Sequence, residues 1–218
     1  MPKPVRSQME VEKVREEIVR GALALIVDDG LESLSMSRLG KRLNMTGANI
    51  YNYFQNRDSL LIAIHKKIFR DLFEKLSASV APETDPAVRA RNLVRAFVRF
   101  GVENVNIYDM MFTRPRLQYR DYIGTPQEDQ AREEYLSSLE GLLLAFRTME
   151  ELLGGVPGMT PDRLRLITVK LISEIHGIIS LMNSRILIDM TDDPEGTLSA
   201  IVDTALESVI SLAGTPAA

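Results

Sequence analysis

The sequence predicts an all-α chain of about nine helices, in which a three-helix N-terminal domain precedes a larger helical C-terminal domain. Apolar residues recur at three- and four-residue spacing through most of the chain, as they do along one face of a helix. Alternating β-branched runs, which would indicate strands, are nearly missing. Prolines within 81–86, and glycines and a proline within 154–158, separate the periodic segments. We expect the N-terminal domain to span residues 1–57 and the C-terminal domain residues 58–218.

The first element should be a helix that follows a short N-terminal arm, MPKPVRSQ. Ile18, Ala22 and Leu25 recur at helical spacing and are expected to face inward. Gly30 should end this helix, because glycine readily adopts the left-handed conformation that helix ends often need.

Residues 34–54 come next and should form two short helices joined by a tight turn. Ser35 or Ser37 can cap the first helix, because a serine hydroxyl accepts from the unpaired backbone amides at a helix start. Gly40 should lie on the inner side of that helix, where the missing side chain lets the second helix cross closely. Asn44 tolerates the left-handed conformation that the turn requires, and Thr46 can cap the second helix.

The second helix of this pair has the features of a DNA recognition helix. Ile50 and Phe54 would anchor it, and its first turn carries small residues that permit close approach to a major groove. Asn49 can pair with an adenine edge, and Tyr51 and Tyr53 can donate to phosphates. Alternatively, these residues decorate a solvent-exposed helical hairpin. The residues expected to contact DNA are Ser35, Ser37, Arg38, Thr46, Gly47, Ala48, Asn49, Tyr51, Asn52, Tyr53 and Arg57.

The flanking segments favour DNA binding. With REEIVRGALALIVDDGLESLS before it and FQNRDSLLIAIHKKIF after it, the hairpin resembles the DNA-binding domain of the TetR family of bacterial transcriptional regulators. The resemblance covers roughly residues 13–70. In that family histidine often stands at the position of Tyr53, glycine at that of Asn44 and lysine at that of Gly47. Without the lysine, one phosphate contact fewer is expected.

The formal charge of −4 divides unevenly along the chain. Residues 1–70 hold 12 lysines and arginines against 8 acidic residues, whereas residues 71–218 hold 14 against 22. A basic N-terminal domain can release counterions from DNA, which contributes much of the affinity, while an acidic remainder is kept away from the phosphates. The charge pattern therefore supports double-stranded DNA as a partner.

The remaining elements follow from periodicity and proline positions. The fourth helix is expected over residues 57–80, since the two prolines within 81–86 cannot continue it. A helix over 87–107 should carry an arginine-rich outer face that pairs with acidic surroundings. A short apolar segment over 108–112 and a polar, poorly periodic stretch over 118–130 come next. Further helices are predicted over 131–152, 161–188 and 194–212.

The helix predicted over 161–188 is apolar on more than one face. Such a helix must be buried on both sides, and a second copy of the chain can cover the side that its own core does not. The resemblance implies the same, since TetR-like regulators dimerise through their last two long helices. In a monomer these would be ordinary core helices. The residues expected at the dimer interface are Ile172, Ile179, Met182, Ile201, Ala205, Ser208 and Val209.

Methionine and phenylalanine side chains are common on the C-terminal helices. Methionine fills irregular space adaptably and suits apolar pockets, although the same residues could simply form the core. Together with the family resemblance, they suggest a cavity for a small apolar or amphipathic effector. The residues expected to line it are Phe97, Phe100, Asn104, Tyr108, Met111, Phe112, Arg114, Phe146, Met149 and His176.

Several other functions are disfavoured. The chain has no cysteine, and its two histidines, His65 and His176, lie far apart, so no metal site, cofactor or catalytic constellation is expected. No secretory signal and no 18-residue apolar stretch free of charges occurs, so we expect a cytoplasmic protein with no membrane partner.

These observations predict a ligand-responsive transcriptional regulator that is not an enzyme. We expect a homodimer that binds a near-palindromic operator, acts as a repressor and is released by its effector. The alternative is an all-helical enzyme or carrier that uses the C-terminal cavity and keeps the N-terminal hairpin as a structural module. Salt-dependent binding to duplex DNA would separate the two.

Overall fold

The computed structural model describes residues 7–114 and 118–213 of the chain. Ten α-helices and three short 3₁₀ or π turns form its regular structure, and no strand occurs among those residues. The all-α class predicted from the sequence is confirmed.

The chain divides into two compact units, each assembled from two separate stretches of sequence. Unit 1 comprises Met1–Phe69 and Asn104–Ser138, and unit 2 comprises Arg70–Glu103 and Leu139–Ala218. Two long helices, α4 (Arg57–Val80) and α7 (Glu128–Leu153), contribute residues to both units. The sequence suggested a boundary between residues 57 and 58, whereas the contacts group the first half of α4 with the N-terminal helices.

Unit 1 begins with α1, which spans Gln8–Asp29. A capping box fixes its start: the Glu10 backbone N–H donates to the Ser7 hydroxyl (3.3 Å), and the Ser7 N–H donates to the Glu10 carboxylate (2.7 Å). The helix ends before Gly30, whose φ of 78° suits glycine far better than other residues. The predicted stop is confirmed, and so is the predicted inward face of Ile18, Ala22 and Leu25.

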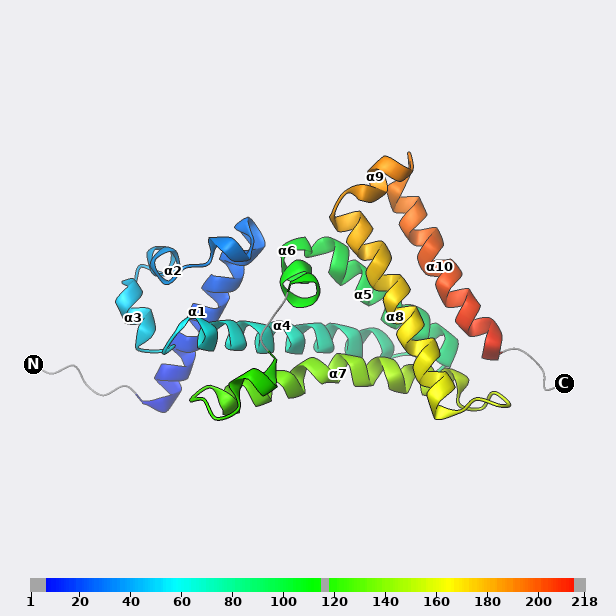
Figure 1. Ribbon diagram of the computed structural model, residues 1–218, viewed down its shortest axis with the longest axis horizontal. Coiled ribbons are helices and arrows are strands. Elements are labelled where there is room, and N and C mark those ends of the chain that lie inside the picture. Colours follow the sequence, from blue (N-terminus) through cyan, green and yellow to red (C-terminus); the bar gives the residue numbers. More distant parts are fainter. Residues whose placement is uncertain (1–6, 115–117, 214–218) are drawn as a thin grey trace, which may run out of the picture. The chain divides into compact units, whose positions relative to one another are not determined.

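Two short helices follow, α2 (Met36–Arg42) and α3 (Gly47–Tyr51), and they pack against each other (Figure 1). The sequence placed Phe54 inside the second of them, but α3 ends at Tyr51. The Phe54 N–H still donates to the Ile50 carbonyl (3.0 Å), so Phe54 is buried in the turn that follows. The fourth helix runs over the residues predicted for it.

The middle of the chain is less regular than predicted. The single helix expected over 87–107 breaks at Asn104, where the backbone leaves the helical region (φ −126°, ψ 54°). The Asn104 carbonyl accepts from the Tyr108 N–H (2.8 Å), which starts a new helix, α6 (Val105–Tyr108). A π turn over Asp109–Thr113 continues it. The polar stretch over 118–130 holds a 3₁₀ turn, Tyr119–Tyr122, and the first residues of α7.

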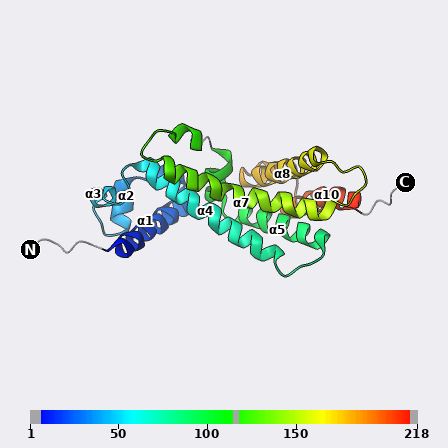
Figure 2. The same ribbon diagram turned by 90° about the horizontal axis from the view of Figure 1, so that it is seen from below.

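Unit 2 is built around α5 (Pro86–Glu103), α8 (Pro161–Asn183) and α10 (Pro194–Ala213), which pack against one another (Figures 1 and 2). The continuous helix predicted over 161–188 is wrong, because α8 ends at Asn183. The Asn183 side-chain amide donates to the Gly101 carbonyl on α5 (3.0 Å), and Arg185 turns the chain through a left-handed φ of 65°. A short helix, α9 (Ile186–Met190), follows and buries Leu187.

The arginines of α5 pair with acidic side chains, as predicted. Arg91 contacts Glu207 (2.6 Å) and Arg95 contacts Asp203 (3.0 Å), both on α10. By length and composition alone α10 could cross a membrane. In the structure its inner face packs against α5 and α8 and buries Val202, Ala205, Leu206 and Val209.

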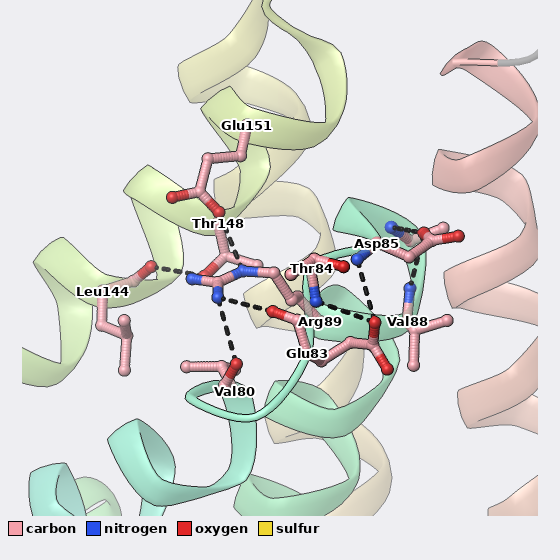
Figure 3. A network of polar contacts seen from close by, with 10 residues as sticks. Val80, Glu83, Thr84, Asp85, Val88, Arg89, Leu144, Thr148 and Glu151 are labelled. Carbon is pink, nitrogen blue, oxygen red and sulfur yellow. Dashed lines mark hydrogen bonds and ion pairs between the residues drawn. The ribbon is translucent and has the colours of Figure 1, made fainter.

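Arg89 ties together three segments of unit 2, as Figure 3 shows. Its Nη1 donates to the carbonyls of Val80 (3.0 Å) and Glu83 (3.1 Å), and its Nε contacts Glu151 on α7 (3.0 Å). Val80 is the last residue of α4, whose final carbonyls lack partners within the helix. Arg89 therefore caps the end of α4 from the first turns of α5.

Candidate nucleic-acid interface

The start of α2 is set by Ser35. Its hydroxyl accepts from the Arg38 backbone N–H (3.1 Å), so Ser35 is the cap that the helix uses. Ser37, the other predicted cap, lies exposed within the first turn of α2. A hydroxyl at that position is free of any capping role and can face a phosphate.

The turn between α2 and α3 depends on two residues. Asn44 has a φ of 53°, the left-handed conformation predicted for it. A Cβ at Gly40 would lie 2.7 Å from the Met45 carbonyl oxygen and 2.9 Å from the Gly47 nitrogen, closer than side chains approach backbone. The Met45 N–H donates to the Gly40 carbonyl (2.8 Å). The absence of a side chain at Gly40 therefore lets α3 begin directly against α2, as the sequence predicted.

α3 is capped by Thr46, whose hydroxyl accepts from the Asn49 N–H (3.1 Å). The turn that follows α3 is held by Arg15 of α1, a contact that sequence reasoning missed. The Arg15 guanidinium lies 4.4 Å from the centre of the Phe54 ring and donates to the Tyr53 carbonyl. Only a weak indication of this contact is present in the sequence. Arg15 lies three residues before the buried Ile18 and therefore on the same face of α1.

The predicted DNA-contacting side chains of α3 and of the two residues after it differ in exposure. Tyr51 is 52% exposed, and Asn52 is exposed as well, whereas Asn49 and Tyr53 are partly buried. The Asn52 amide donates to the Asn49 side-chain oxygen (3.2 Å), which fixes the orientation of Asn49. Among the other predicted residues, Thr46, Ala48 and Arg57 are exposed and Gly47 is half-buried.

The exposed cations of α2 form a group that the sequence prediction included only in part. Arg38, Lys41 and Arg42 recur at three- and four-residue spacing and are all exposed. Arg38 is paired with Asp29 (2.5 Å) and Arg42 with Asp28 (3.1 Å) at the end of α1. The spacing of 38, 41 and 42 was the signal that could have identified Lys41 and Arg42.

The ten predicted effector-binding residues are divided equally between the two units. In unit 1, Tyr108 and Met111 are buried, Phe112 packs against Tyr108 (5.1 Å between ring centres), and Asn104 is half-buried. Arg114 is exposed and held by ion pairs with Asp109 and Glu32.

In unit 2, the effector-binding candidates meet on facing helices. The Phe97 ring of α5 lies edge-on to the His176 ring of α8, with 5.2 Å between the centres. Burial lowers the pKa of His176 below its ordinary value, so the imidazole is neutral at pH 7. Phe100 and Met149 are buried, and Phe146 is half-buried.

The predicted dimer residues also fall into two groups. Ile179, Ala205 and Val209 are buried within unit 2 itself, whereas Ile201 is 40% exposed and Ser208 is exposed. Ile172 and Met182 are half-buried. The apolar side chains most exposed on α8, Leu166 and Val169, were not among the predicted interface residues.

The family emerges from comparison with known proteins. Residues 18–64 match the description of bacterial regulatory proteins of the tetR family, and residues 90–205 match the tetracyclin repressor-like C-terminal domain. The chain belongs to the tetR family. The resemblance inferred from residues 13–70 is thereby confirmed, and the α2–α3 pair is the helix-turn-helix of a DNA-binding transcriptional regulator.

Individual relatives of this tetR-family chain are distant. The nucleoid occlusion factor SlmA of Pasteurella multocida is 25% identical over 128 residues, which cover 55% of this chain and 63% of that protein. The chain thus spans about three fifths of the length of the curated relatives it matches.

Two solved structures illustrate the shared fold. A protein of unknown function from Rhodococcus sp. RHA1 has a TM-score of 0.67 at 20% identity and covers 95% of this chain and 97% of its own. The transcriptional regulator FadR of Bacillus subtilis, solved with stearoyl-CoA, has a TM-score of 0.61 at 17% identity and covers 90% and 97%.

Proposed function

We propose that this tetR-family protein is a ligand-responsive transcriptional regulator that binds duplex DNA through α2 and α3. The observation that carries the proposal is the close crossing at Gly40, which joins two separately capped helices with a left-handed turn at Asn44. A recognition helix held in this way presents its first turn to the major groove while the preceding helix crosses the phosphate backbone.

Each element would make a different kind of contact. On α3, Asn49 would read a base edge, with Thr46, Gly47 and Ala48 close to the groove. Tyr51, Asn52, Tyr53 and Arg57 would contact phosphates from the end of α3 and the start of α4, and Ser35, Ser37 and Arg38 from α2. Phosphate contacts set affinity and salt dependence, whereas the base contact sets sequence preference.

Duplex binding can be tested by fluorescence anisotropy, after selecting genomic fragments that the protein retains. We expect affinity to fall steeply as salt rises, because phosphate contacts release counterions. Tyr51→Ala should weaken binding to all sequences similarly. Asn49→Ala should change preference at one position per half-site by about 1–3 kcal/mol.

Asn92→Ala serves as the matched control, since it removes an amide from α5 in unit 2 and should leave DNA binding unchanged. Absence of salt-sensitive binding to every fragment would contradict the proposed function. If Asn49→Ala lowers the affinity for all sequences by the same factor, Asn49 does not read a base, although the proposal of DNA binding stands.

We also propose that the regulator acts as a homodimer on a near-palindromic operator. The support is the apolar surface that α8 and α10 leave exposed in a single chain, where Leu166 is 70%, Val169 47% and Ile201 40% exposed. Exposed apolar surface of this kind is typical of protein interfaces. Such a dimer would repress transcription by occupying DNA that RNA polymerase must contact. Because the operator would lie in bacterial chromosomal DNA, we propose that the protein acts in the cytoplasm.

The effector is proposed to be an apolar or amphipathic small molecule that binds in unit 2 beside Phe97 and His176. Both rings are half-buried, so a ligand can reach them, and a neutral imidazole can donate or accept one hydrogen bond. The stearoyl-CoA bound to FadR supplies the first chemical class to test. The chain is proposed to act by binding and not by catalysis, as its regulator relatives suggest.

Stearoyl-CoA is expected to raise the melting temperature of the protein. At 100 times its Kd a ligand stabilises the folded state by about 2.7 kcal/mol, which scanning calorimetry detects readily. Phe97→Trp should remove this shift and keep DNA binding, because Phe97 is half-buried and can be enlarged with less strain than the buried Phe100 or Met149.

Leu143→Trp is the control for the calorimetric experiment, since it adds the same ring on an exposed part of α7, outside the proposed dimer surface. A full thermal shift in Phe97→Trp would place the ligand elsewhere. No shift with stearoyl-CoA in the wild-type protein would reject long-chain acyl thioesters as the effector class.

A further inference from the structure

Two acidic residues at the end of α1 hold two of the arginines on α2. We propose that Asp29 and Asp28 compete with DNA phosphates for Arg38 and Arg42, so that the two carboxylates lower the affinity of the helix-turn-helix for DNA. The inference rests on the proposed function, because it concerns the affinity of the same DNA-binding surface. It assigns to α1 an autoinhibitory contact within unit 1.

The geometry of the two pairs is suited to competition. Arg38 Nη2 lies 2.5 Å from Asp29 Oδ2, and Arg42 Nη1 lies 3.1 Å from Asp28 Oδ2. All four side chains are about half exposed, from 40% to 53%. The arginines are therefore within reach of a phosphate in solvent, but each is already engaged by a carboxylate. A phosphate must displace that carboxylate or share the guanidinium with it.

Arg38 and Arg42 lie on the same face of α2, and both pair with the last turn of α1. Arg38 and Arg42 are four residues apart on α2, so they lie on one face of that helix. Asp28 and Asp29 are consecutive in the last turn of α1. In a helix-turn-helix the face of the first helix that crosses the DNA backbone carries the phosphate contacts. Both paired arginines thus belong to the helix that should supply these contacts.

Helix electrostatics argue against a role for the two carboxylates in stabilising α1 itself. The C-terminal end of a helix carries partial negative charge and favours cations, so Asp28 and Asp29 are unfavourably placed with respect to α1 alone. Ion pairs with α2 offset that repulsion in the free protein. When a phosphate approaches, the carboxylates repel it at the same short range at which they attract the arginines.

Lys41 provides an internal comparison on the same helix. It is exposed, and no ion pair is found for it among residues 7–114 and 118–213. A phosphate can therefore bind Lys41 without displacing a carboxylate. The inference predicts that neutralising Asp28 or Asp29 changes the contributions of Arg42 and Arg38, respectively, and leaves that of Lys41 unchanged.

The test measures DNA affinity of the full chain by anisotropy on the selected fragment at fixed low salt. Asp29→Asn is expected to tighten binding about two- to five-fold, which corresponds to the modest strength of one exposed ion pair. Asp28→Asn should tighten binding by a similar factor. In the double variant the gain in affinity should be about the product of the two single factors. Thermal unfolding of each variant verifies that the helix-turn-helix remains folded.

Glu32→Gln is the matched control for net charge. Glu32 is exposed and lies three residues after Asp29, but its partner is Arg114 and not a residue of α2. Its neutralisation should tighten binding less than Asp29→Asn does. A second control repeats Asp29→Asn in an Arg38→Gln background, where the specific gain should disappear because the contested guanidinium is gone. Lys41→Gln should weaken binding by the same factor with or without Asp29→Asn.

The outcomes separate this inference from the function on which it rests. A wild-type protein that binds no duplex at low salt overturns both. A wild type that binds DNA, but gains equally from Glu32→Gln and Asp29→Asn or keeps the gain in the Arg38→Gln background, overturns the inference alone and assigns the effect to net charge. Weaker binding of Asp29→Asn would also overturn it and would make Asp29 a residue that positions Arg38 for DNA.

Discussion

Gly40→Ala is expected to destabilise the N-terminal unit and to lower DNA affinity at least ten-fold. Alanine normally stabilises a helix interior by about 1 kcal/mol relative to glycine. At Gly40 the added methyl group would meet three backbone atoms of residues 45–47 at 2.7–3.1 Å, and backbone cannot move aside as a side chain can. Overpacking of this kind costs about 1–3 kcal/mol. The clash should therefore outweigh the gain in propensity and shift α3 away from α2.

The same substitution at Gly177 is the matched control. Gly177 lies within α8, and an added Cβ would meet nothing within 4 Å. Gly177→Ala should therefore raise stability by about 0.5–1 kcal/mol. Chemical denaturation measures both free energies of unfolding, and anisotropy measures DNA affinity. Stabilisation by both alanines would show that the crossing at Gly40 tolerates a side chain, contrary to the structural argument.

Ile179→Arg is expected to unfold unit 2, because Ile179 is fully buried in the packing of its own chain. A guanidinium placed there without a partner costs several kcal/mol, a large part of the stability of a typical domain. Ile201→Arg should behave differently. Ile201 is 40% exposed on α10, so the arginine can reach solvent in a single chain and should interfere only with association.

Circular dichroism and analytical ultracentrifugation distinguish the two variants. We expect loss of cooperative unfolding in Ile179→Arg, and a folded monomer with weakened operator binding in Ile201→Arg. A wild-type protein that sediments as a monomer at micromolar concentration would contradict the proposed dimer. A dimeric Ile201→Arg would move the interface away from that part of α10.

Local signals in the sequence were sufficient for the helix-turn-helix. Caps and left-handed turns depend on one residue and its immediate neighbours, which is why the sequence could assign Asn44 and Thr46 and could narrow the cap of α2 to Ser35 or Ser37. The helix breaks at Asn104 and Asn183 could not be predicted in this way. The Asn183 amide contacts Gly101, which is 82 residues away in sequence, so the reason for the break is tertiary.

Apolar periodicity also left the candidate interface residues ambiguous. It identifies a side chain that avoids water but not which surface covers it, so Ile179 and Val209 were grouped with Ile201 although only Ile201 remains exposed. The ion pairs of Arg38 and Arg42 were unpredictable for a related reason, because they depend on where α1 ends relative to α2. The pairing of the α5 arginines was easier to predict. Residues 71–218 are rich in acidic side chains, so partners were expected without knowledge of which residues they would be.

The interleaved composition of the two units has a consequence for biosynthesis. Unit 1 needs residues up to Ser138, and unit 2 needs residues up to the last helix, so neither is complete when the helix-turn-helix has left the ribosome. Domains that are continuous in sequence can fold one after the other during synthesis. Here, the first 69 residues emerge long before the segment 104–138 that completes their packing. Nascent chains of this regulator should therefore expose part of the apolar surface of α4 until residue 138 has been translated, and chaperones that bind such surfaces should engage it during that interval.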